Sequence, residues 1–346
     1  CNSSLKSCDD HSFSCGANGV IFNIIRIIDS IKDRKFTILK VGNDMARKYR
    51  LYQIDSFTKE KLSGNPAGVI TNADGLSSGE MQRIARELNN SETAFIFKSD
   101  NSESDVHIRF FTPTHEVPIC GHATIAAHYA RAVENSLNTG KVYHKTGAGI
   151  LPVDVINEGN DYKIIMTQGS ISFDAVIDGL ALENIFTAFN ISENDLLEDC
   201  PVQIVSTGHS KVMIGIKNSE LLHRLNPNMD LLTKVSGLIN CNGFYVFTMN
   251  APDSDILIHG RMFAPAIGIN EDPVTGNANG PLGAYLIHHR LVKHDNNLFS
   301  FKAVQGEAIK RAGIIDVQVK ICNQEPEEVR IAGNAVIVFK SELLLD

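Results

Sequence analysis

Apolar and polar residues follow patterns along this chain that predict a regular α+β fold from about residue 51 onwards. Residues 51–57 alternate as in a β-strand, and the apolar run 94–97 is typical of a short buried strand. Between them, Ser77 and Glu80 form a capping-box pattern ahead of a helix that should end at residues 89–90. The other predicted elements are strands at 107–111, 141–155, 162–167, 202–206, 212–216, 244–247 and 257–263, and helices at 123–135, 180–189 and 228–238.

Four sequence landmarks recur in the same order about 150 to 160 residues further along the chain. This ordered recurrence predicts a duplication with two pseudo-symmetric domains, each a mixed, curled β-sheet around a central helix. The alternative is two unrelated α+β halves that share common turn types. The paired landmarks are 91–97 with 241–247, 111–113 with 263–265, 120–123 with 275–278, and 145–150 with 304–309.

The repeat also suggests the domain boundaries. We expect an N-terminal domain at 49–172 and a C-terminal domain at 173–346, with a last strand that is able to cross between them. Residues 1–48 fit the pattern poorly and are interpreted as an extension outside the fold, with Met45 as the native start. An amphipathic helix at 20–31 remains open, and its charges make that stretch unsuited to cross a membrane.

Each copy of the repeat carries a glycine at the start of a small-residue helix, Gly121 in the first copy and Gly276 in the second. The first N–H groups of a helix have no partner within it, and the helix dipole is positive at that end. If the two copies face each other, the N–H groups of these glycines, His122 and Asn277 converge on one cleft. Such a cleft suits a carboxylate ligand.

Composition and charge narrow the functional classes. The 346 residues are 43% hydrophobic and 21% charged, which fits a globular protein of about two domains. The net charge is −8, and no run of lysine and arginine is interleaved with aromatic residues, which argues against nucleic acid as a partner. Seven cysteines without a C-x-x-C pair favour neither a zinc site nor a disulfide framework. No Walker loop, G-x-G-x-x-G or H-E-x-x-H motif is present, so we expect a cytoplasmic protein without cofactor, metal or membrane partner.

Four motifs in register carry a family resemblance. They are Gly64-Asn65-Pro66-Ala67-Gly68, Ser91-Glu92-Thr93, Pro118-Ile119-Cys120-Gly121-His122-Ala123 and Glu271-Asp272-Pro273-Val274-Thr275-Gly276-Asn277-Ala278. In order and spacing they resemble the PhzF-like phenazine-biosynthesis isomerase family, from about Tyr52 to the C-terminus. That family has the diaminopimelate-epimerase-like fold, which agrees with the repeat. The resemblance also implies a homodimer.

Glu92 is the candidate acid/base. It lies where a helix gives way to an apolar strand, a setting that raises the pKa of a carboxyl group. Taken alone, the residue is more typical of a solvated turn glutamate. The resemblance implies instead that Glu92 moves a proton between carbons of the substrate. Its counterpart in the repeat is Asn242, which does not titrate, so acid/base chemistry is expected on one side only.

The resemblance further implies that His122 and Asp272 line the pocket and assist the proton movement. As isolated residues they are also consistent with a helix N-cap substitute and with the aspartate before proline in a turn. The predicted catalytic set is therefore Glu92, His122 and Asp272. The predicted substrate-binding set is Asn65, Gly121, His122, Gly276 and Asn277, while 208–210 is either a border of the cleft or a plain turn.

Cys120 separates two reaction types. Related epimerases of this fold use one cysteine from each half, and Cys120 occupies the first of those positions. The repeat places Thr275 at the second, and a threonine hydroxyl is too weak an acid to replace a thiol. Cys120 is interpreted as a small buried hydrophobic residue.

These observations predict a cofactor-independent isomerase that acts on a small carboxylate in the cleft between the two domains. The alternative is a ligand-binding or interaction protein on the same fold without catalysis. A two-cysteine amino-acid epimerase is the third hypothesis, and it requires a thiol facing Cys120.

Overall fold

A computed structural model of the protein describes residues 46–250, 254–295 and 297–346. The predicted start at Met45 and the predicted helix at 20–31 lie outside the described residues. The first strand begins at Arg47, so the last two residues assigned to the extension belong to the fold. Residues 48–345 pack as one compact unit, and the boundary placed after residue 172 stays a prediction.

The first copy of the repeat contains eight strands and two helices among the described residues. The strands are β1 (Arg47–Ser56), β2 (Asn65–Ile70), β3 (Glu92–Lys98), β4 (Val106–Phe111), β5 (Glu116–Val117), β6 (Gly140–Thr146), β7 (Gly149–Asn157) and β8 (Tyr162–Thr167). The helices are α2 (Ser78–Leu88) and α3 (Gly121–Asn135). None of the described helices of the chain has the length and apolarity that a membrane span requires.

The second copy follows the same order with a few additions. Its strands are β9 (Ser172–Val176), β10 (Gln203–Ser206), β11 (Ser210–Gly215), β12 (Phe244–Met249), β13 (Ile258–Ala264), β14 (Ile269–Asp272), β15 (Leu298–Gln305), β16 (Gly313–Cys322) and β17 (Glu325–Leu345). Its helices are α4 (Gly179–Phe189), α5 (Ser219–Arg224), α6 (Met229–Ile239) and α7 (Gly276–His288), with short 3-10 turns η1 (Glu193–Asp195) and η2 (Pro265–Ile267).

The strand pairings of the two copies match one by one. Antiparallel β1–β2, parallel β2–β3 and antiparallel β3–β4 correspond to antiparallel β10–β11, parallel β11–β12 and antiparallel β12–β13. Parallel β4–β6 followed by antiparallel β6–β7 and β7–β8 corresponds to parallel β13–β15 followed by antiparallel β15–β16 and β16–β17. Two unrelated halves would not share both order and direction, so the predicted pseudo-symmetric fold is confirmed.

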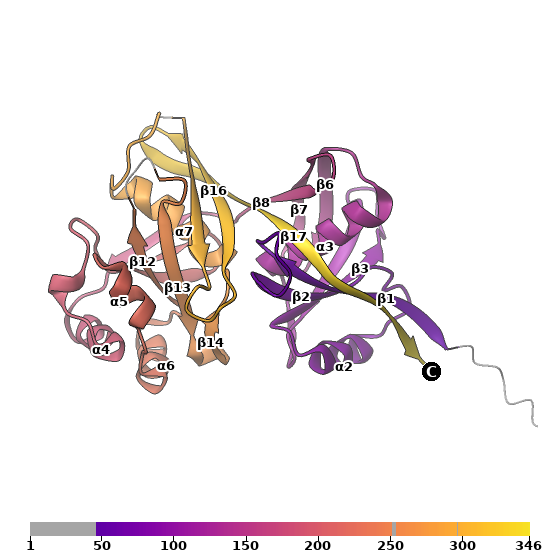
Figure 1. Ribbon diagram of the computed structural model, residues 1–346, viewed down its shortest axis with the longest axis horizontal. Coiled ribbons are helices and arrows are strands. Elements are labelled where there is room, and N and C mark those ends of the chain that lie inside the picture. The colour runs from indigo at the N-terminus through magenta and orange to yellow at the C-terminus, as the bar shows by residue number, and fades with distance from the viewer. Residues whose placement is uncertain (1–45, 251–253, 296) are drawn as a thin grey trace, which may run out of the picture. The chain divides into compact units, whose positions relative to one another are not determined.

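Each copy wraps its sheet around one helix. In the first copy, β17 pairs with both β8 and β1, which closes the ring of strands that surrounds α3 (Figure 1). The helix α3 is buried along most of its length, and so is α7. A helix that is buried on all sides must be apolar or small all round, and the alanine and glycine residues of these two helices meet that requirement.

The predicted helix after Ser77 is confirmed at both ends. The Ser77 hydroxyl accepts from the backbone N–H of Glu80, and the Glu80 carboxylate accepts from the N–H of Ser77, which completes the capping box. Asn89 ends the helix in the left-handed conformation, with φ of 51°.

The motif at 64–68 was expected to form a turn, but most of it lies in a strand. Only Gly64 has a positive φ, of 60°, and a Cβ atom there would lie 2.3 Å from the carbonyl oxygen of Ser56. The residues after it form β2 and pair with β1. The chain reverses direction before β2, in the loop 57–64, where Phe57 and Leu62 also have positive φ, so Asn65 already lies in the sheet.

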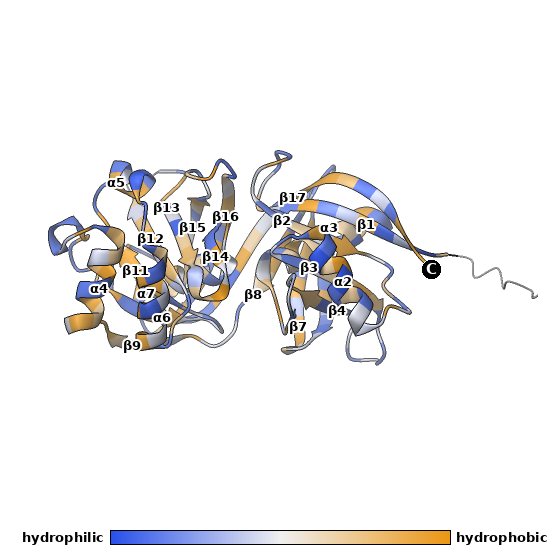
Figure 2. Cartoon of the chain, turned by 90° about the horizontal axis from the view of Figure 1, so that it is seen from below, coloured by the Kyte–Doolittle hydropathy of each residue, from blue (hydrophilic) through white to orange (hydrophobic). Residues whose placement is uncertain are grey.

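The strand β17 joins the two copies. It pairs with β16 from Glu325 to Ala332 and with β8 from Arg330 to Asn334. Hydrophobic and polar residues alternate along it (Figure 2), as a strand with two differently exposed faces requires. One strand therefore takes part in the sheets of both copies.

Candidate active site

A cavity of about 200 Å³ lies between the two copies of the repeat. It is slightly larger than a cavity that holds benzene in an engineered protein, about 150 Å³. The first copy lines it with Glu92, Cys120, Gly121 and His122, and the second with His209, Lys211, Asp272, Thr275, Gly276 and Asn277. All three predicted catalytic residues therefore lie at one cavity.

The starts of α3 and α7 meet at this cavity. Cys120 and Thr275 are their N-caps, and neither makes a side-chain capping hydrogen bond. A Cβ atom on Gly121 would lie 4.0 Å from the Cα atom of Gly276. Within the described residues, no hydrogen-bond acceptor faces the backbone N–H groups of Gly121, His122, Gly276 or Asn277. Two positive helix ends with free donors therefore converge on the same small space.

Glycine is required at the start of α7 for a steric reason. A Cβ atom on Gly276 would lie 2.4 Å from Cδ1 of Ile331, which β17 carries between the two copies. The carbonyl oxygen of Gly276 accepts a hydrogen bond of 2.9 Å from Nε2 of Gln168. Gln168 and Ile331, which lie far from Gly276 in sequence, thus fix the start of α7. This brings the N–H groups of α7 close to those at the start of α3.

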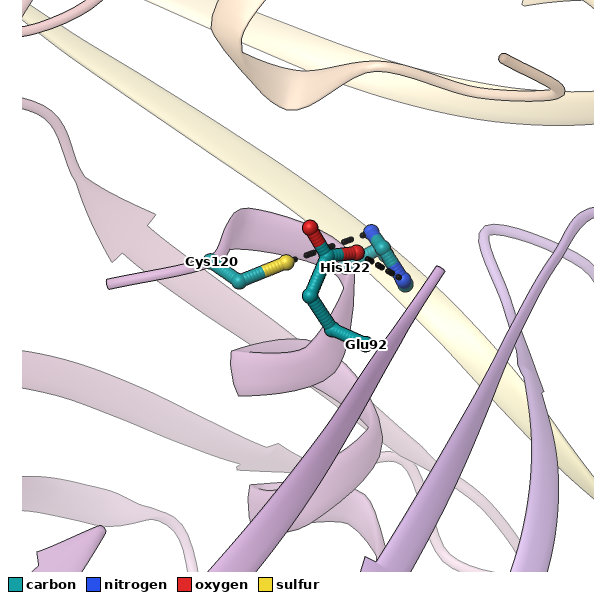
Figure 3. Close-up of side chains that lie close together, drawn as sticks. All are labelled: Glu92, Cys120 and His122. Atoms are coloured by element: carbon teal, nitrogen blue, oxygen red, sulfur yellow. Dashed lines mark hydrogen bonds and ion pairs between the residues drawn. The ribbon is translucent and has the colours of Figure 1, made fainter. Parts of the chain in front are cut away.

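Glu92 is the first residue of β3, and its side chain is 15% exposed. Its carboxylate lies 3.4 Å from Nε2 of His122, and Figure 3 shows the carboxylate and the Cys120 thiol directed towards the same imidazole. Burial raises the pKa of Glu92, while hydrogen bonds from Ser91 and Cys120 act in the opposite direction. The net effect is a raised pKa, so this carboxyl group holds its proton more strongly than a solvated glutamate does.

His122 bridges the polar groups on this side of the cavity. Its Nδ1 lies 3.4 Å from Sγ of Cys120, and its Nε2 lies 3.3 Å from Oγ of Ser91. Burial lowers the pKa of His122, whereas the charge of Asp272 and a hydrogen bond to the carbonyl of Pro66 raise it. The imidazole is neutral in this setting, so it orients Glu92 without neutralising its charge.

Asp272 ends β14 and is buried, and burial raises its pKa. It accepts hydrogen bonds from Nδ2 of Asn65, at 2.9 Å, and from the hydroxyl of Thr275. Asn65 is fully buried, does not line the cavity and donates a second hydrogen bond to the carbonyl of Val274. These contacts fit the positioning of Asp272, and direct contact of Asn65 with a substrate stays a prediction.

The sequence analysis did not identify Gln305, which holds the loop that carries Asp272 and Thr275. Gln305 is fully buried and donates through Nε2 to the carbonyl of Asp272 and to Oγ1 of Thr275. Its Oε1 accepts from the N–H of Thr275 and from Nδ2 of Asn279. Its place in the repeated landmark 304–309 was a signal of importance, but the pattern alone did not reveal what it binds.

Cys120 does not act as an exposed nucleophile in this geometry. Burial, together with the charges of Glu92 and Asp272, raises the pKa of its thiol well above the usual range. The corresponding helix start carries Thr275, whose hydroxyl donates to Asp272. A pair of thiols facing each other, as a two-cysteine epimerase needs, is not formed at these positions.

The register of the sheet changes which residue corresponds to Glu92. Thr93 pairs with Phe111 in the first copy, and Phe244 pairs with Phe263 in the second. Since Phe111 and Phe263 are repeat partners, the counterpart of Glu92 is Gly243 and not Asn242. Neither Asn242 nor Gly243 titrates, so acid/base chemistry is still expected on the side of Glu92 only.

Two groups of side chains have the donor types of a metal site. Glu92, Cys120 and His122 offer three ligand atoms within 4.8 Å of one another, and so do His223, His259 and Glu307. In the first group these atoms contact one another, as do His259 and Glu307 in the second, at 2.8 Å. We assign no metal to either group.

Known proteins match the chain along most of its length. A sequence model of the phenazine biosynthesis-like protein family, PhzC-PhzF, matches residues 54–341. An uncharacterised isomerase of Clostridium acetobutylicum is 70% identical over 302 residues, covering 87% of this chain and 100% of that protein. The trans-2,3-dihydro-3-hydroxyanthranilate isomerase of Pseudomonas chlororaphis is 29% identical over 294 residues, covering 84% of this chain and 98% of that enzyme.

A solved structure matches as well. The crystal structure of the Bacillus anthracis phenazine biosynthesis protein of the PhzF family superposes with a TM-score of 0.77 at 31% identity. The match covers 86% of this chain and 100% of that chain. Sequence and structure therefore match over both copies of the repeat and over the whole cavity.

Proposed function

The chain belongs to the phenazine biosynthesis-like (PhzC-PhzF) family of isomerases, and we propose that it moves a proton between two carbons of a small carboxylate, with Glu92 as the acid/base. Relatives that are named isomerases support the reaction type. The observation that carries the proposal is the convergence of the Glu92 carboxylate with the starts of α3 and α7 on one cavity.

In the proposed reaction, the substrate carboxylate accepts hydrogen bonds from the free N–H groups at Gly121 and Gly276. Glu92 breaks one C–H bond by taking the proton, and the electron pair moves into the neighbouring unsaturated system. The same carboxyl group then gives the proton to another carbon while the double bond shifts. One C–H bond is broken and one is formed, so the step requires neither an oxidant nor a reductant.

The free N–H groups stabilise negative charge that develops on the substrate in the transition state. Such donors act strongly where water is excluded and are positioned before the reaction begins. The two glycines lie close together, since a Cβ atom on Gly121 would be 4.0 Å from the Cα atom of Gly276. A carboxylate placed between them receives donors from both copies at once, which orients the carbon that Glu92 must reach.

His122 and Asp272 complete the proposed machinery. The neutral imidazole of His122 holds the Glu92 carboxylate at 3.4 Å. Asp272 faces the cavity from the other copy, and its burial raises its pKa, as is common for groups that assist proton transfer. General acid/base catalysis of this kind contributes about 10²- to 10⁴-fold to a reaction rate.

The test is exchange of substrate protons with solvent. The protein is incubated in D₂O with small unsaturated carboxylic acids, including trans-2,3-dihydro-3-hydroxyanthranilate, and deuterium incorporation is followed by NMR. Glu92→Gln keeps the shape of the side chain and removes the proton acceptor, so exchange should fall by about 10²- to 10⁴-fold. The matched control is Glu87→Gln on the exposed face of α2, which should exchange at the wild-type rate.

Two outcomes contradict the proposal. Exchange at the wild-type rate in Glu92→Gln would remove this residue from the mechanism. A carboxylate that binds in the cavity of the wild-type protein without any exchange at its carbons would favour the ligand-binding alternative.

A further inference from the structure

Lys211 lines the cavity and has no part in the proposed proton transfer. It lies in β11 and is only partly exposed. Its Nζ donates one hydrogen bond, of 3.0 Å, to the carbonyl of Ser210. Among the residues that the structure describes, none places a carboxylate oxygen within 4.0 Å of this ammonium group. A largely buried cation without a counter-ion is costly, which makes its function of interest.

The repeat gives Lys211 a specific relation to Glu92. In the first copy, Ala67 of β2 pairs with Glu92 of β3. In the second copy, Val212 pairs with Phe244, which places Lys211 beside Gly243. Each pair thus contains one long charged side chain and one small residue, but the long side chain is on the other strand.

The small partner provides the space for the long one. A Cβ atom on Gly243 would lie 2.3 Å from Cδ and 2.7 Å from Cε of Lys211, so the lysine stem occupies the space over this glycine. Neighbouring strands are only about 4.8 Å apart, and paired residues point to the same face of the sheet. The ammonium group of Lys211 therefore enters the cavity at the position that the repeat relates to the Glu92 carboxylate.

The surroundings of Lys211 leave its charge available to a ligand. The titratable groups that interact with it through charge are the imidazole of His209, the thiol of Cys241 and the carboxylate of Asp272. The oxygens of Asp272 already accept hydrogen bonds from Asn65 and Thr275. A charged group of the ligand is then the natural partner for the remaining N–H donors of Lys211.

We propose that Lys211 binds a second anionic group of the substrate, so that the site takes a small dicarboxylate. This inference rests on the proposed function, in which the starts of α3 and α7 hold the first carboxylate. The two anion sites lie on one cavity of about 200 Å³, which limits the separation of the two carboxylates to that of a short or cyclic carbon skeleton. A monocarboxylate would leave the ammonium group of Lys211 without a partner.

The test compares matched ligands that differ in one carboxylate. Malonate, succinate, glutarate and adipate are titrated by calorimetry against propanoate, butyrate, pentanoate and hexanoate. The wild-type protein should bind at least one diacid about tenfold or more tightly than its monoacid partner, since a hydrogen bond to a charged group is worth about 1.5–3 kcal/mol, or 10- to 150-fold. Lys211→Met and Lys211→Gln should lose this preference and keep the affinity for the monoacid.

Two further variants sharpen the test. Lys234→Met removes an exposed lysine of α6 and should leave the preference unchanged. Gly243→Ala keeps the charge of Lys211 but displaces its stem, so it should reduce the preference. The inference is overturned if no diacid binds more tightly than its partner in the wild-type protein. It is also overturned if the Lys211 variants keep the preference, even when they lose proton exchange.

The outcome of this binding assay is independent of the outcome of the exchange assay that tests the proposed function. The two assays report on different residues, since proton exchange depends on Glu92 and the diacid preference depends on Lys211. Loss of the diacid preference would leave the exchange assay with Glu92→Gln intact. Unchanged exchange in Glu92→Gln would leave the binding assay with Lys211 intact.

Discussion

Gln305 offers a sharp test of how the fold supports the active site. It is fully buried below the loop that carries Asp272, and it makes four hydrogen bonds to three residues of that region. Leucine has a similar size but cannot form any of them. Gln305→Leu should therefore leave the N–H of Thr275 and the carbonyl of Asp272 buried without a partner.

The size of the effect follows from these two groups. A buried polar group without a partner costs about 1–3 kcal/mol, so the expected loss in the free energy of unfolding is about 2–6 kcal/mol. The other two partners retain alternatives, because the Thr275 hydroxyl still donates to Asp272 and the Asn279 amide still donates to the carbonyl of Thr275. They are left out of the sum.

Urea unfolding followed by circular dichroism measures this loss. With a slope of about 3 kcal/mol per molar urea, the midpoint should fall by about 0.7–2 M. The matched control is Gln318→Leu in β16, a partly exposed position whose side chain makes no hydrogen bond to the described residues, and its midpoint should move by less than about 0.2 M. Equal midpoints for the two variants would refute the reasoning from the buried hydrogen bonds.

The remaining predictions concern pH, reactivity and packing. Burial raises the pKa of Glu92 above its unfolded value of about 4.3, so its ionisation costs folding stability as the pH rises above that value. Thermal melts should show Glu92→Gln gaining on the wild-type protein as the pH is raised from about 4.3, and a constant difference would contradict this. The thiol of Cys120 is protonated at neutral pH, so Cys120→Ala should keep proton exchange within about tenfold of the wild-type rate, whereas a larger loss would restore a role for the thiol. A Cβ atom on Gly260 would lie 2.0 Å from Oη of the buried Tyr245, so Gly260→Ala should lower the free energy of unfolding by about 1–3 kcal/mol. Gly237→Ala in α6 meets no atom within 4 Å and should raise it by about 0.5–1 kcal/mol, and similar midpoints in urea for these two variants would argue against the packing account.

Local patterns were enough to predict many of the longer elements, although the strands β15 and β16 were not predicted. The helix α2 was located because its caps and its apolar spacing lie within a few residues of each other. The starts of α3 and α7 were located because a glycine before a run of small residues is a local signal. The short elements β5, β9, β14 and α5 were not predicted, since two to six residues carry too weak a pattern to identify.

The candidate site was predicted only in part. Glu92, His122 and Asp272 were named from motifs, and the structure brings all three to one cavity. Asn65 was named as a substrate-binding residue, and its hydrogen bond to Asp272 was not predicted because Asp272 is 207 residues away in sequence. Lys211 belongs to no motif, and nothing in the alternation of β11 distinguishes it from an ordinary surface lysine.

The sequence by itself determined the repeat, the family and the types of chemical group at the cavity, because these depend on the order and spacing of residues along the chain. Only the tertiary structure decided which groups face one another. The pairing of β3 with β4 and of β12 with β13 made Gly243 the counterpart of Glu92, and it placed the lysine stem above that glycine. The physical reason is that sheet register is set by pairing between separate strands, and helix convergence by contacts between segments that lie far apart in sequence, and a local pattern encodes neither.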